Sequence, residues 1–576
     1  MTPEILLREF ERLSDAPDAV GRLRQLVLDL AVRGKLVEQD AADEQASELL
    51  KRVCLERSRL AKRGEIPHRN IDSDVVGLER IFEPPAGWVW TRLGVMTIIN
   101  QGFAFPSSDY SEIPNDGPPL IKIGDIGSDA PNTFIKGDFK TSYLVRPGEL
   151  LLGLSGSIKC AIWRGPAALL NQRIARINPA SVDVENAWMF LCVNNCISKW
   201  KEETSKLTVQ NIKAKQLHEA PVLLPPLAEQ KRIVAKVDEL MALCDRLEAA
   251  RTAREATRDR LVAAALHRLT SPQDPSPQPP GQPATPPETF QTHARFYLNN
   301  LPRLATRAEH VEALRRGILD LAMCGKLVEQ DPAEEPASEL LKRIAAEKAR
   351  LIKAGKIKKL AVDPINKGEA PFDIPVQWHW TRLGSVGDWG AGSTPSRTRS
   401  DFYEGNITWL KSGELNDNQC LSGSEEKLTE HAVTKGSFRV NQPGDVLIAM
   451  YGATIGKLAI LAESAVTNQA VCGCTPFDGV LNRFLYIFLR SEREKFHASS
   501  EGGAQPNISK VKIVWTPFPL PPLAEQKRIV AKVDELMALC DDLETAIRTQ
   551  SETSQRLLDA AIREALADHQ PALEVA

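Results

Sequence analysis

The sequence has little that would hold a fold together covalently or anchor it in a membrane. Its ten cysteines never form a CxxC pair, and the closest are Cys192 with Cys196 and Cys472 with Cys474. We therefore expect neither a disulfide framework nor a four-cysteine zinc site. Nowhere do about eighteen uninterrupted apolar residues occur. The N-terminal MTPEILLREFERL mixes acids and arginines with apolar residues, so we expect no secretory leader, no membrane contact and a cytoplasmic location.

The chain also lacks an excess of charge of either sign. Lys and Arg number 72 against 75 Asp and Glu, which gives a formal net charge of −3. No positive field covers the whole molecule, so any nucleic-acid site must be local. The 576 residues exclude a single small module.

Catalytic motifs are missing as well. The P-loop pattern G-x-x-x-x-G-K-S/T is absent, because GATIGK at 452–457 has three residues between its glycines. No NPPY or DPPY tetrapeptide and no F-x-G-x-G loop is present, as an adenine methyltransferase would require, and none of the nine histidines forms HExxH. Glu425-x-Lys427 resembles the end of a nuclease motif, but Asp417 is a weak partner and surface charge pairing explains it better. We predict a chain that is not itself an enzyme.

What is present is a tandem duplication. Residues 224–248 (LPPLAEQKRIVAKVDELMALCDRLE) and 520–544 differ only at Arg246 against Asp542. GKLVEQD, ASELLKR and W-x-W-T-R-L-G also occur twice, about 290 residues apart. Between these shared segments, residues 95–220 and 385–516 are similar in length but largely different in sequence. Weak echoes such as Asn171-Gln172 with Asn468-Gln469 suggest one insert fold with altered surface residues.

The shared segments are predicted to be helical. After Pro226, apolar residues recur at three- and four-residue steps, with Ile233, Leu240, Leu247 and Leu261 on a multiple-of-seven register. The pattern runs to about Leu269, which predicts a helix of roughly 44 residues. Further amphipathic helices at 20–31 and 46–62, with copies at 311–322 and 337–353, could complete a bundle or an antiparallel coiled coil.

The inserts contain short β-like runs separated by turn residues, and each is predicted to be a mixed α/β or mainly β domain. Prolines crowd residues 271–288, which favours an extended tether. We assign an N-terminal helical region to residues 1–80, a first insert domain to 81–222, a central long helix to 223–270 and a proline-rich linker to 271–295. A second helical region follows at 296–370, a second insert domain at 371–518 and a C-terminal long helix at 519–576.

The LPPLAEQKRIV run, AVRGKLVEQD and ASELLKR, and the alternation of two variable regions with shared ones, resemble the DNA specificity subunit of type I restriction–modification systems. The resemblance covers nearly the whole chain. It implies an α+β fold: two target-recognition domains of mixed α/β type in a pseudo-twofold arrangement, separated by long helices that form an antiparallel coiled-coil spacer. It also implies a non-catalytic subunit that reads an asymmetric bipartite target in double-stranded DNA.

The resemblance further implies two methyltransferase subunits, which bind S-adenosylmethionine and methylate adenine N6, and restriction subunits that use ATP and Mg to translocate and cleave DNA. No cofactor or metal is expected on this chain itself.

Base readout and phosphate contact need Lys, Arg, amide and hydroxyl side chains on loops that border strands. Loops of this composition recur in both inserts. For a single Ser or Asn a turn or cap role is the favoured alternative, and the Asn-Gln pairs could tie loops together. The candidate DNA-binding residues are Ser107, Ser108, Lys122, Ser155, Ser157, Lys159, Gln172, Arg173, Asn211 and Lys213 in the first insert, and Ser393, Thr394, Ser396, Arg397, Lys411, Tyr451, Thr454, Lys457, Asn468, Gln469, Asn507, Ser509 and Lys510 in the second.

The identical run at 224–245 and 520–541 could reflect recent duplication alone, or docking of the same partner twice. Polar residues at the start of each long helix are expected to be exposed, where they either contact a partner or form a solvated face. The candidates are Glu229, Gln230, Arg232 and Lys236 with their copies Glu525, Gln526, Arg528 and Lys532.

Two rival functions belong to other classes. A self-contained restriction–methylation enzyme is disfavoured because cofactor and nuclease motifs are missing. A helical scaffold that binds only proteins also fits divergent inserts on a shared frame, and DNA footprinting would distinguish it.

Overall fold

A computed structural model describes residues 16, 18–67, 71, 75, 83–114, 116–156, 158–204, 211–270, 299–301, 303–366, 368–436, 438–500 and 506–567. The chain forms two compact units. Unit 1 comprises the described residues of Met1–Ala253 and Gln550–Ala576, and unit 2 those of Arg254–Thr549. The predicted proline-rich linker lies outside the described residues, as does Ser157.

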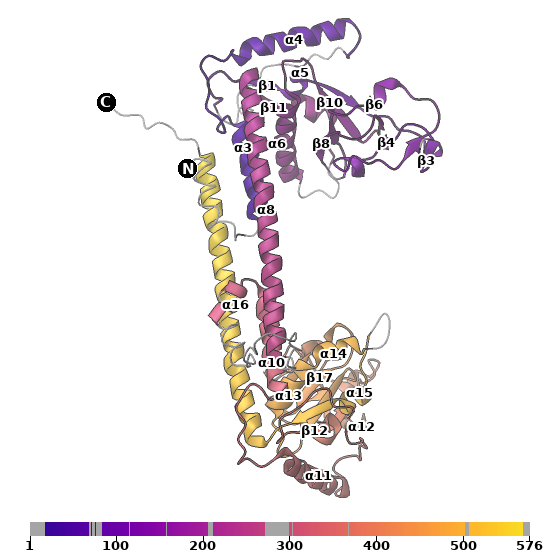
Figure 1. Ribbon diagram of the computed structural model, residues 1–576. Helices are drawn as coiled ribbons and strands as arrows, with labels where there is room; N and C mark the ends of the chain where they lie inside the picture. Colours follow the sequence, from indigo (N-terminus) through magenta and orange to yellow (C-terminus); the bar gives the residue numbers. More distant parts are fainter. Residues whose placement is uncertain are drawn as a thin grey trace, which may run out of the picture. The chain divides into compact units, whose positions relative to one another are not determined.

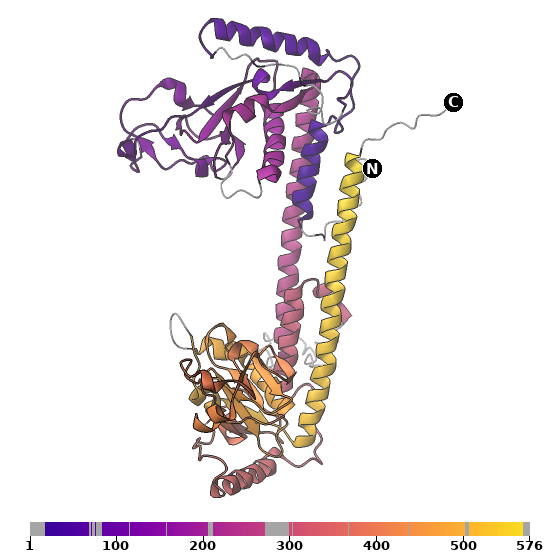
Figure 2. The same cartoon turned by 180° about the vertical axis from the view of Figure 1, so that it is seen from behind.

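Unit 1 has a helical part in which α3 (Ala19–Val32) shares one hydrophobic core with two long helices. Leu23, Leu26 and Leu30 of α3 are buried together with Ile233 and Val237 of α8 (Leu227–Thr270) and with Leu558 and Ala561 of α16 (Leu523–Leu566). Both views show α3 alongside the first half of α8 (Figure 1 and Figure 2). Arg24 adds ion pairs to Asp245 at 2.7 Å and Glu248 at 2.6 Å.

Unit 2 repeats this helical part with the roles of the long helices exchanged. Its α10 (Ala308–Met323) shares a core with Ile529 and Val533 of α16, and Arg315 reaches Asp541 at 2.5 Å and Glu544 at 2.8 Å. The last turns of α8 pack Val262 and Leu269 against Leu304. In each unit, therefore, the first half of one long helix lies with the last turns of the other. This is the antiparallel relationship that the family resemblance implies.

Both long helices have 44 residues, as predicted for the first of them. The multiple-of-seven register is wrong at its end, because Leu261 is 48% exposed whereas Val262 and Leu269 are buried. A straight α-helix drifts by about 20° per heptad, so over the four heptads from Ile233 the buried stripe moves by nearly one residue. Within unit 2, the buried residues at this end of α8 pack with Leu304.

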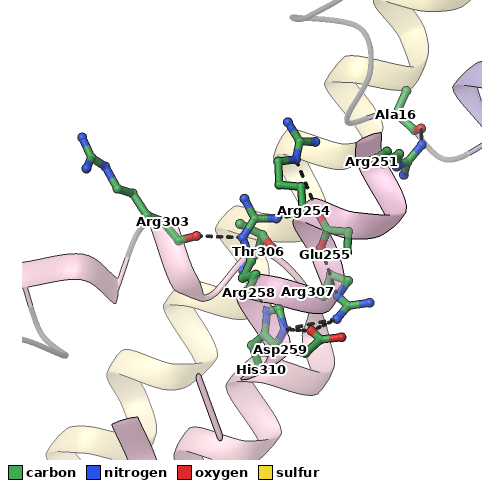
Figure 3. Close-up of polar contacts among 10 residues, drawn as sticks. All are labelled: Ala16, Arg251, Arg254, Glu255, Arg258, Asp259, Arg303, Thr306, Arg307 and His310. Carbon is green, nitrogen blue, oxygen red and sulfur yellow. Dashed lines mark hydrogen bonds and ion pairs between the residues drawn. The ribbon is translucent and has the colours of Figure 1, made fainter. Parts of the chain in front are cut away.

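A polar cluster also joins the second half of α8 to the start of α10 and the residues before it in unit 2 (Figure 3). His310 Nε2 lies 2.8 Å from Asp259 Oδ1, and Arg307 also binds this carboxylate. Arg258 donates to Glu255 at 2.5 Å and to the carbonyl of Arg303 at 2.9 Å. The duplication does not repeat this cluster, because the residue 291 positions before His310 is Ala19.

The insert domain of unit 1 is built on small sheets. A four-stranded sheet has the order β2-β10-β7-β8, a three-stranded sheet has the order β4-β9-β6, and β1 pairs with β11 as β3 does with β5. Helix α6 (Asn186–Thr204) packs on β8 and β10, and its buried Trp188 meets Trp88 edge-on at 5.6 Å. The strands are β1 Val89–Arg92, β2 Thr97–Gln101, β3 Tyr110–Ser111, β4 Leu120–Ile121, β5 Phe134–Ile135, β6 Leu144–Val145, β7 Leu150–Gly153, β8 Cys160–Ile162, β9 Ala168–Leu170, β10 Ile174–Pro179 and β11 Pro221–Leu224.

The insert domain of unit 2 follows a similar plan, in which the larger sheet gains a fifth strand and β14 is eight residues long. Its five-stranded sheet has the order β13-β20-β17-β18-β15, its three-stranded sheet has the order β16-β14-β19, and β12 pairs with β21. The strands are β12 His379–Arg382, β13 Gly387–Ala391, β14 Tyr403–Leu410, β15 Asn418–Leu421, β16 Glu426–Leu428, β17 Val446–Ala449, β18 Leu458–Leu461, β19 Val466–Thr467, β20 Val471–Pro476 and β21 Pro517–Leu520.

The remaining helices are short apart from two. Unit 1 contains α4 Ala46–Lys62, α5 Leu93–Met96 and α7 Ala214–Glu219, and unit 2 contains α11 Ala337–Lys353, α12 Glu430–Lys435, α13 Asn482–Ser491, α14 Arg493–Ala498 and α15 Lys510–Trp515. In each unit an antiparallel strand pair, β1 with β11 or β12 with β21, joins the entry and exit of the insert domain just before a long helix. The predicted mixed α/β fold of both inserts is confirmed. None of the described helices is long and apolar enough to cross a membrane.

Candidate nucleic-acid interface

Loops that are far apart in the sequence meet at one edge of the insert domain in unit 1. Phe103 N donates to the carbonyl of Leu170 at 2.9 Å, and Gln172 N donates to that of Phe103 at 3.0 Å. Leu154 N donates to the carbonyl of Arg173 at 2.8 Å, and Ser155 forms a backbone bridge with Asn211. Since β4 pairs in parallel with β9, Lys122 follows directly beside the loop that begins at Asn171. We call the loops at 101–105, 122–125, 154–156 with 158–159, 171–173 and 211–213 the loop edge of unit 1.

Unit 2 builds an equivalent edge, in which three of these backbone contacts recur. Ser393 N donates to the carbonyl of Thr467 at 2.9 Å, and Met450 N donates to that of Ala470 at 2.8 Å. Tyr451 forms a backbone bridge with Asn507, and Asn468 N donates to the carbonyl of Leu410, directly before Lys411. The loops at 391–399, 411–414, 450–457, 467–470 and 506–510 form the loop edge of unit 2.

A glycine allows the first loop of each edge to approach its neighbour. A Cβ atom on Gly102 would lie 2.2 Å from the carbonyl oxygen of Leu170, and one on Gly392 would lie 2.1 Å from that of Thr467. Contacts this short between a Cβ and a backbone oxygen do not occur in real structures. The two glycines therefore hold equivalent loops in equivalent places.

The predicted DNA-binding side chains of unit 1 are mostly solvent-accessible. Lys122 lies over the ring of Tyr110 at 5.3 Å, and Ser107 and Ser108 form the exposed 3-10 turn η2 (Ser107–Asp109) just before that ring. Lys159 lines a hollow of about 540 Å³ together with Ser128 and Asn194. Ser155 is half-buried, and Gln172, Arg173, Asn211 and Lys213 are exposed.

In unit 2 the two strongest cationic candidates meet at a single carboxylate. Arg397 donates to Glu426 at 2.6 and 3.1 Å, and Lys411 donates to it at 2.5 Å. These hydrogen bonds, first from Arg397 and then from Lys411, lower the pKa of Glu426 to about 2. The guanidinium of Arg397 also lies 4.9 Å from the ring of Tyr403 and 5.6 Å from that of Trp409. The planar fork of Arg397 is thus held by a carboxylate and two rings.

Several candidates in unit 2 have structural contacts of the kind that the alternative interpretation expected. Asn468 Oδ1 accepts a hydrogen bond from Ala470 N at 3.1 Å, as Asn171 Oδ1 does from Arg173 N at 3.0 Å. Ser509 caps α15 by accepting from Lys512 N at 3.2 Å. Further internal contacts join Thr454 to the carbonyl of Tyr451, Ser396 to Thr398, Lys457 to Asn416 and Gln469 N to Thr394. Tyr451, Asn507 and Gln469 are exposed, and Lys510 and Ser393 are half-buried.

Four of the predicted partner contacts are wrong about exposure. Glu229 and Gln230 are 1% and 0% exposed, and Glu525 and Gln526 are both 0% exposed. Trp88 Nε1 donates to Glu229 at 2.9 Å and Trp378 Nε1 donates to Glu525 at the same distance. Burial raises the pKa of both carboxyls.

The glutamines are internal for the same reason. Gln230 Oε1 accepts from Glu185 N at 3.0 Å, and Gln526 Oε1 accepts from Leu481 N at 2.9 Å, so each amide ties the long helix to the insert domain. Polar residues in a first helical turn are usually exposed. Here the strand pair before the long helix and the residue before α6 in unit 1, or before α13 in unit 2, cover that turn.

The basic partner candidates remain partly accessible. Arg232 pairs with Asp43 at 2.7 Å, and Arg528 pairs with Glu334 in the equivalent place. Lys236 and Lys532 each pair with a glutamate three residues further along their own helix, Glu239 and Glu535. Charge reversal at Arg232 or Arg528 would therefore disturb an internal ion pair as well as any partner contact.

The nuclease-like residues do not form a site. The carboxylate of Asp417 binds the guanidinium of Arg493 and accepts from Leu458 N at 3.1 Å. Its own carbonyl accepts from Tyr486 at 2.7 Å. Asp417 therefore has a structural role, in agreement with the interpretation of these charges as ion pairs and not as a nuclease site.

Sequence reasoning missed Glu426, the rings under the cations, and the exposed Phe103. Glu426 sits inside the Glu425-x-Lys427 motif that was set aside as surface charge. The only signal for the rings is that Tyr110 and Tyr403 each follow the first loop of their insert, eight residues after Gly102 and eleven after Gly392.

Comparison with known proteins identifies the duplicated frame. The family described as "Type I restriction modification DNA specificity domain" matches residues 85–255 and 375–552. The specificity subunit of the type I restriction enzyme EcoAI of Escherichia coli is 32% identical over 566 residues, covering 94% of this chain and 93% of the relative. That of EcoEI, also from Escherichia coli, is 29% identical over 574 residues, covering 95% and 94%.

A solved structure titled for the complex assembly and conformational transition of the type I R-M system covers 84% of this chain and 99% of its own, at 18% identity and a TM-score of 0.47. The matches to the family and to the EcoAI subunit each span most of the chain. The chain therefore belongs to the DNA specificity subunits of type I restriction–modification systems.

Proposed function

We propose that the loop edges of the two units each read one half of an asymmetric, bipartite target in double-stranded DNA. The observation that carries this proposal is the repeated edge: the same backbone contacts present different exposed side chains in the two units. A fixed frame with variable side chains is what two different half-sites require, since base identity is read by donors, acceptors and apolar groups at base edges.

Different chemistry at the two edges supports asymmetry. The edge of unit 1 offers separate exposed cations and amides, such as Lys122, Arg173 and Gln172. The edge of unit 2 offers a linked set, Arg397 and Lys411 around Glu426. Arginine oriented in this way suits bidentate contact with guanine, and a carboxylate suits the amino group of cytosine.

A specificity subunit is the non-catalytic member of its complex, so the chemistry belongs to partners. We place two methyltransferase subunits, with S-adenosylmethionine and adenine-N6 methylation, and restriction subunits, with ATP and Mg, beside this chain in the cytoplasm. The identical run at 224–245 and 520–541 supports two copies of one methyltransferase.

The near-neutral charge of the inserts supports DNA binding in which partner subunits supply many of the phosphate contacts. Residues 95–220 hold 13 basic and 12 acidic side chains, and residues 385–516 hold 13 and 14. Since phosphate neutralisation supplies much of the affinity of DNA-binding proteins, we expect the isolated chain to bind DNA weakly and with strong dependence on salt.

The deciding experiment is base-resolution mapping of adenine methylation in cells that express this chain with its methyltransferase, compared with the methyltransferase alone. An asymmetric two-part motif that requires this chain is the expected result. A soluble complex that forms and methylates no motif would contradict the proposal and favour a scaffold that binds only proteins.

A further inference from the structure

The two loop edges carry different side chains at one equivalent backbone position. Phe103 N and Ser393 N each donate at 2.9 Å to the last residue of the neighbouring strand, Leu170 or Thr467. Each residue follows the glycine whose missing Cβ permits that approach. The backbone therefore fixes where the side chain begins, while its chemistry changes from an aromatic ring to a hydroxyl.

Phe103 is an apolar surface at an otherwise polar edge. Phe103 is 44% exposed, and its neighbours along the edge include the exposed polar residues Gln172 and Arg173. The ring meets Phe105 edge-on with 5.1 Å between centroids, and it meets Tyr143 at 5.3 Å. Phe105 is itself buried in a small core with Leu120, Ile135 and Leu169.

These contacts support the ring on two neighbouring rings while the residue stays 44% exposed. A ring that is already held loses little conformational freedom when it contacts a ligand. Base edges in the major groove are polar except for the C5-methyl group of thymine, which apolar side chains such as Phe contact. A serine hydroxyl can donate to or accept from a polar base edge instead.

On the basis of the proposed function, we propose that residues 103 and 393 form one specificity-determining position. Phe103 contacts the methyl group of a thymine in one half-site, and Ser393 contacts a polar base edge in the other. The inference assigns a base class to each unit, which the proposed function alone does not.

Exchange of the two side chains tests the position. In complexes with the methyltransferase, Phe103→Ser should relax an A·T preference in one half-site, and Ser393→Phe should alter only the other. Phe103→Leu, which keeps an apolar group, should retain the A·T preference. Val182→Ser is the matched control, because Val182 is apolar and 97% exposed but lies after β10 and away from the loop edge.

A wild-type half-site made of G·C pairs only, or a Phe103→Ser motif that is unchanged or altered in both halves, would overturn this inference while leaving the bipartite function intact. A wild-type complex that methylates no motif would overturn the proposed function and this inference with it.

A second measurement isolates the methyl group. Target duplexes in which single thymines of that half-site are replaced by deoxyuridine lack only the C5-methyl. One such replacement should weaken binding of the wild-type complex by about fourfold, the effect of one buried methyl-sized group. The Phe103→Ser complex should bind both duplexes equally. Equal binding of thymine and uracil by the wild-type complex would overturn the assignment and favour a ring inserted between bases.

Discussion

The indole Nε1 of Trp88 lies 2.9 Å from Oε2 of Glu229, and Trp378 and Glu525 repeat this hydrogen bond. The contact joins two duplicated motifs, W-x-W-T-R-L-G before the insert and LPPLAEQKR after it. Only one of the two carboxylates is fully satisfied: Gln330 donates to Glu525 Oε1 at 2.5 Å, whereas Glu229 Oε1 has no hydrogen-bond partner among the described residues.

This difference predicts unequal effects of one substitution. Glu229→Gln keeps an acceptor for Trp88 and removes a buried charge, so it should be neutral or stabilising at neutral pH. Glu525→Gln should be less favourable, because an amide nitrogen would replace the oxygen that accepts from Gln330. Glu229→Ala should lower the free energy of unfolding by about 1 to 3 kcal/mol, since the Trp88 donor is left unpaired.

The pH dependence has a definite sign. Because burial raises the pKa of folded Glu229 above the ordinary 4.5, its contribution to stability is fully present below pH 4.5 and is lost as pH rises through the folded value. Relative to wild type, Glu229→Gln should therefore gain melting temperature as pH rises from 4.5 to neutrality. Calorimetry over this pH range measures the difference in melting temperature between the two proteins. A difference that stays constant with pH would contradict the prediction.

The glycines of the loop edges should tolerate no side chain. Gly102→Ala and Gly392→Ala each force a Cβ against a backbone carbonyl, so either should cost about 1 to 3 kcal/mol and displace the first loop. Methylation of the mapped target should slow in both variants. Gly368→Ala, which lies outside both loop edges, is the matched control, because a Cβ there meets nothing within 4 Å. Equal activity in all three variants would show that the loop position is unimportant.

The long helices and the duplication could be predicted because both are local signals. Ile233, Val237, Leu240 and Cys244 are buried at the three- and four-residue steps of the pattern. The register fails at Leu261, where the helix passes to different packing partners that periodicity alone cannot identify.

The site could be predicted in outline only. Composition identified the loops, but their convergence depends on strand pairings such as Ile121 with Leu170 and Ser155 with Asn211, which join distant residues. Glu229 was misjudged for a related reason. Its charge predicts an exposed residue, and only the fold brings Trp88 to its buried carboxylate.

His310 should stabilise unit 2 alone. His310 is 4% exposed, its Nδ1 accepts from Thr306 N at 3.3 Å, and its Nε2 lies 2.8 Å from Asp259 Oδ1 (Figure 3). His310→Ala leaves the Thr306 amide without this acceptor and should lower the free energy of unfolding by about 1 to 3 kcal/mol.

Hydrogen exchange locates the effect of His310→Ala. Faster exchange is expected at residues 254–262 and 303–310 and not in α3, where Ala19 occupies the equivalent position. Glu309→Ala, at an exposed neighbouring residue, serves as the control. Protection that falls equally in α3 would argue against a local role.

Glu426 should restrain the affinity of unit 2 for phosphates. Its carboxylate neutralises Arg397 and Lys411, and with a pKa of about 2 it remains ionised at any pH at which the complex would be assayed. In the complex with its methyltransferase, Glu426→Gln should strengthen binding to non-target duplex DNA. The slope of log K against log salt should steepen by up to about 0.9 for each cation released to a phosphate.

Discrimination should fall in the same variant, because Arg397 loses the carboxylate that orients its fork above Tyr403 and Trp409. The ratio of methylation at the mapped target to that at sites with one mismatch measures this loss. Glu430→Gln removes a negative charge from the exposed surface of α12 in the same unit and should change neither quantity. If Glu430→Gln steepens the salt slope as much as Glu426→Gln, the effect comes from net charge and not from the release of two cations held at the loop edge.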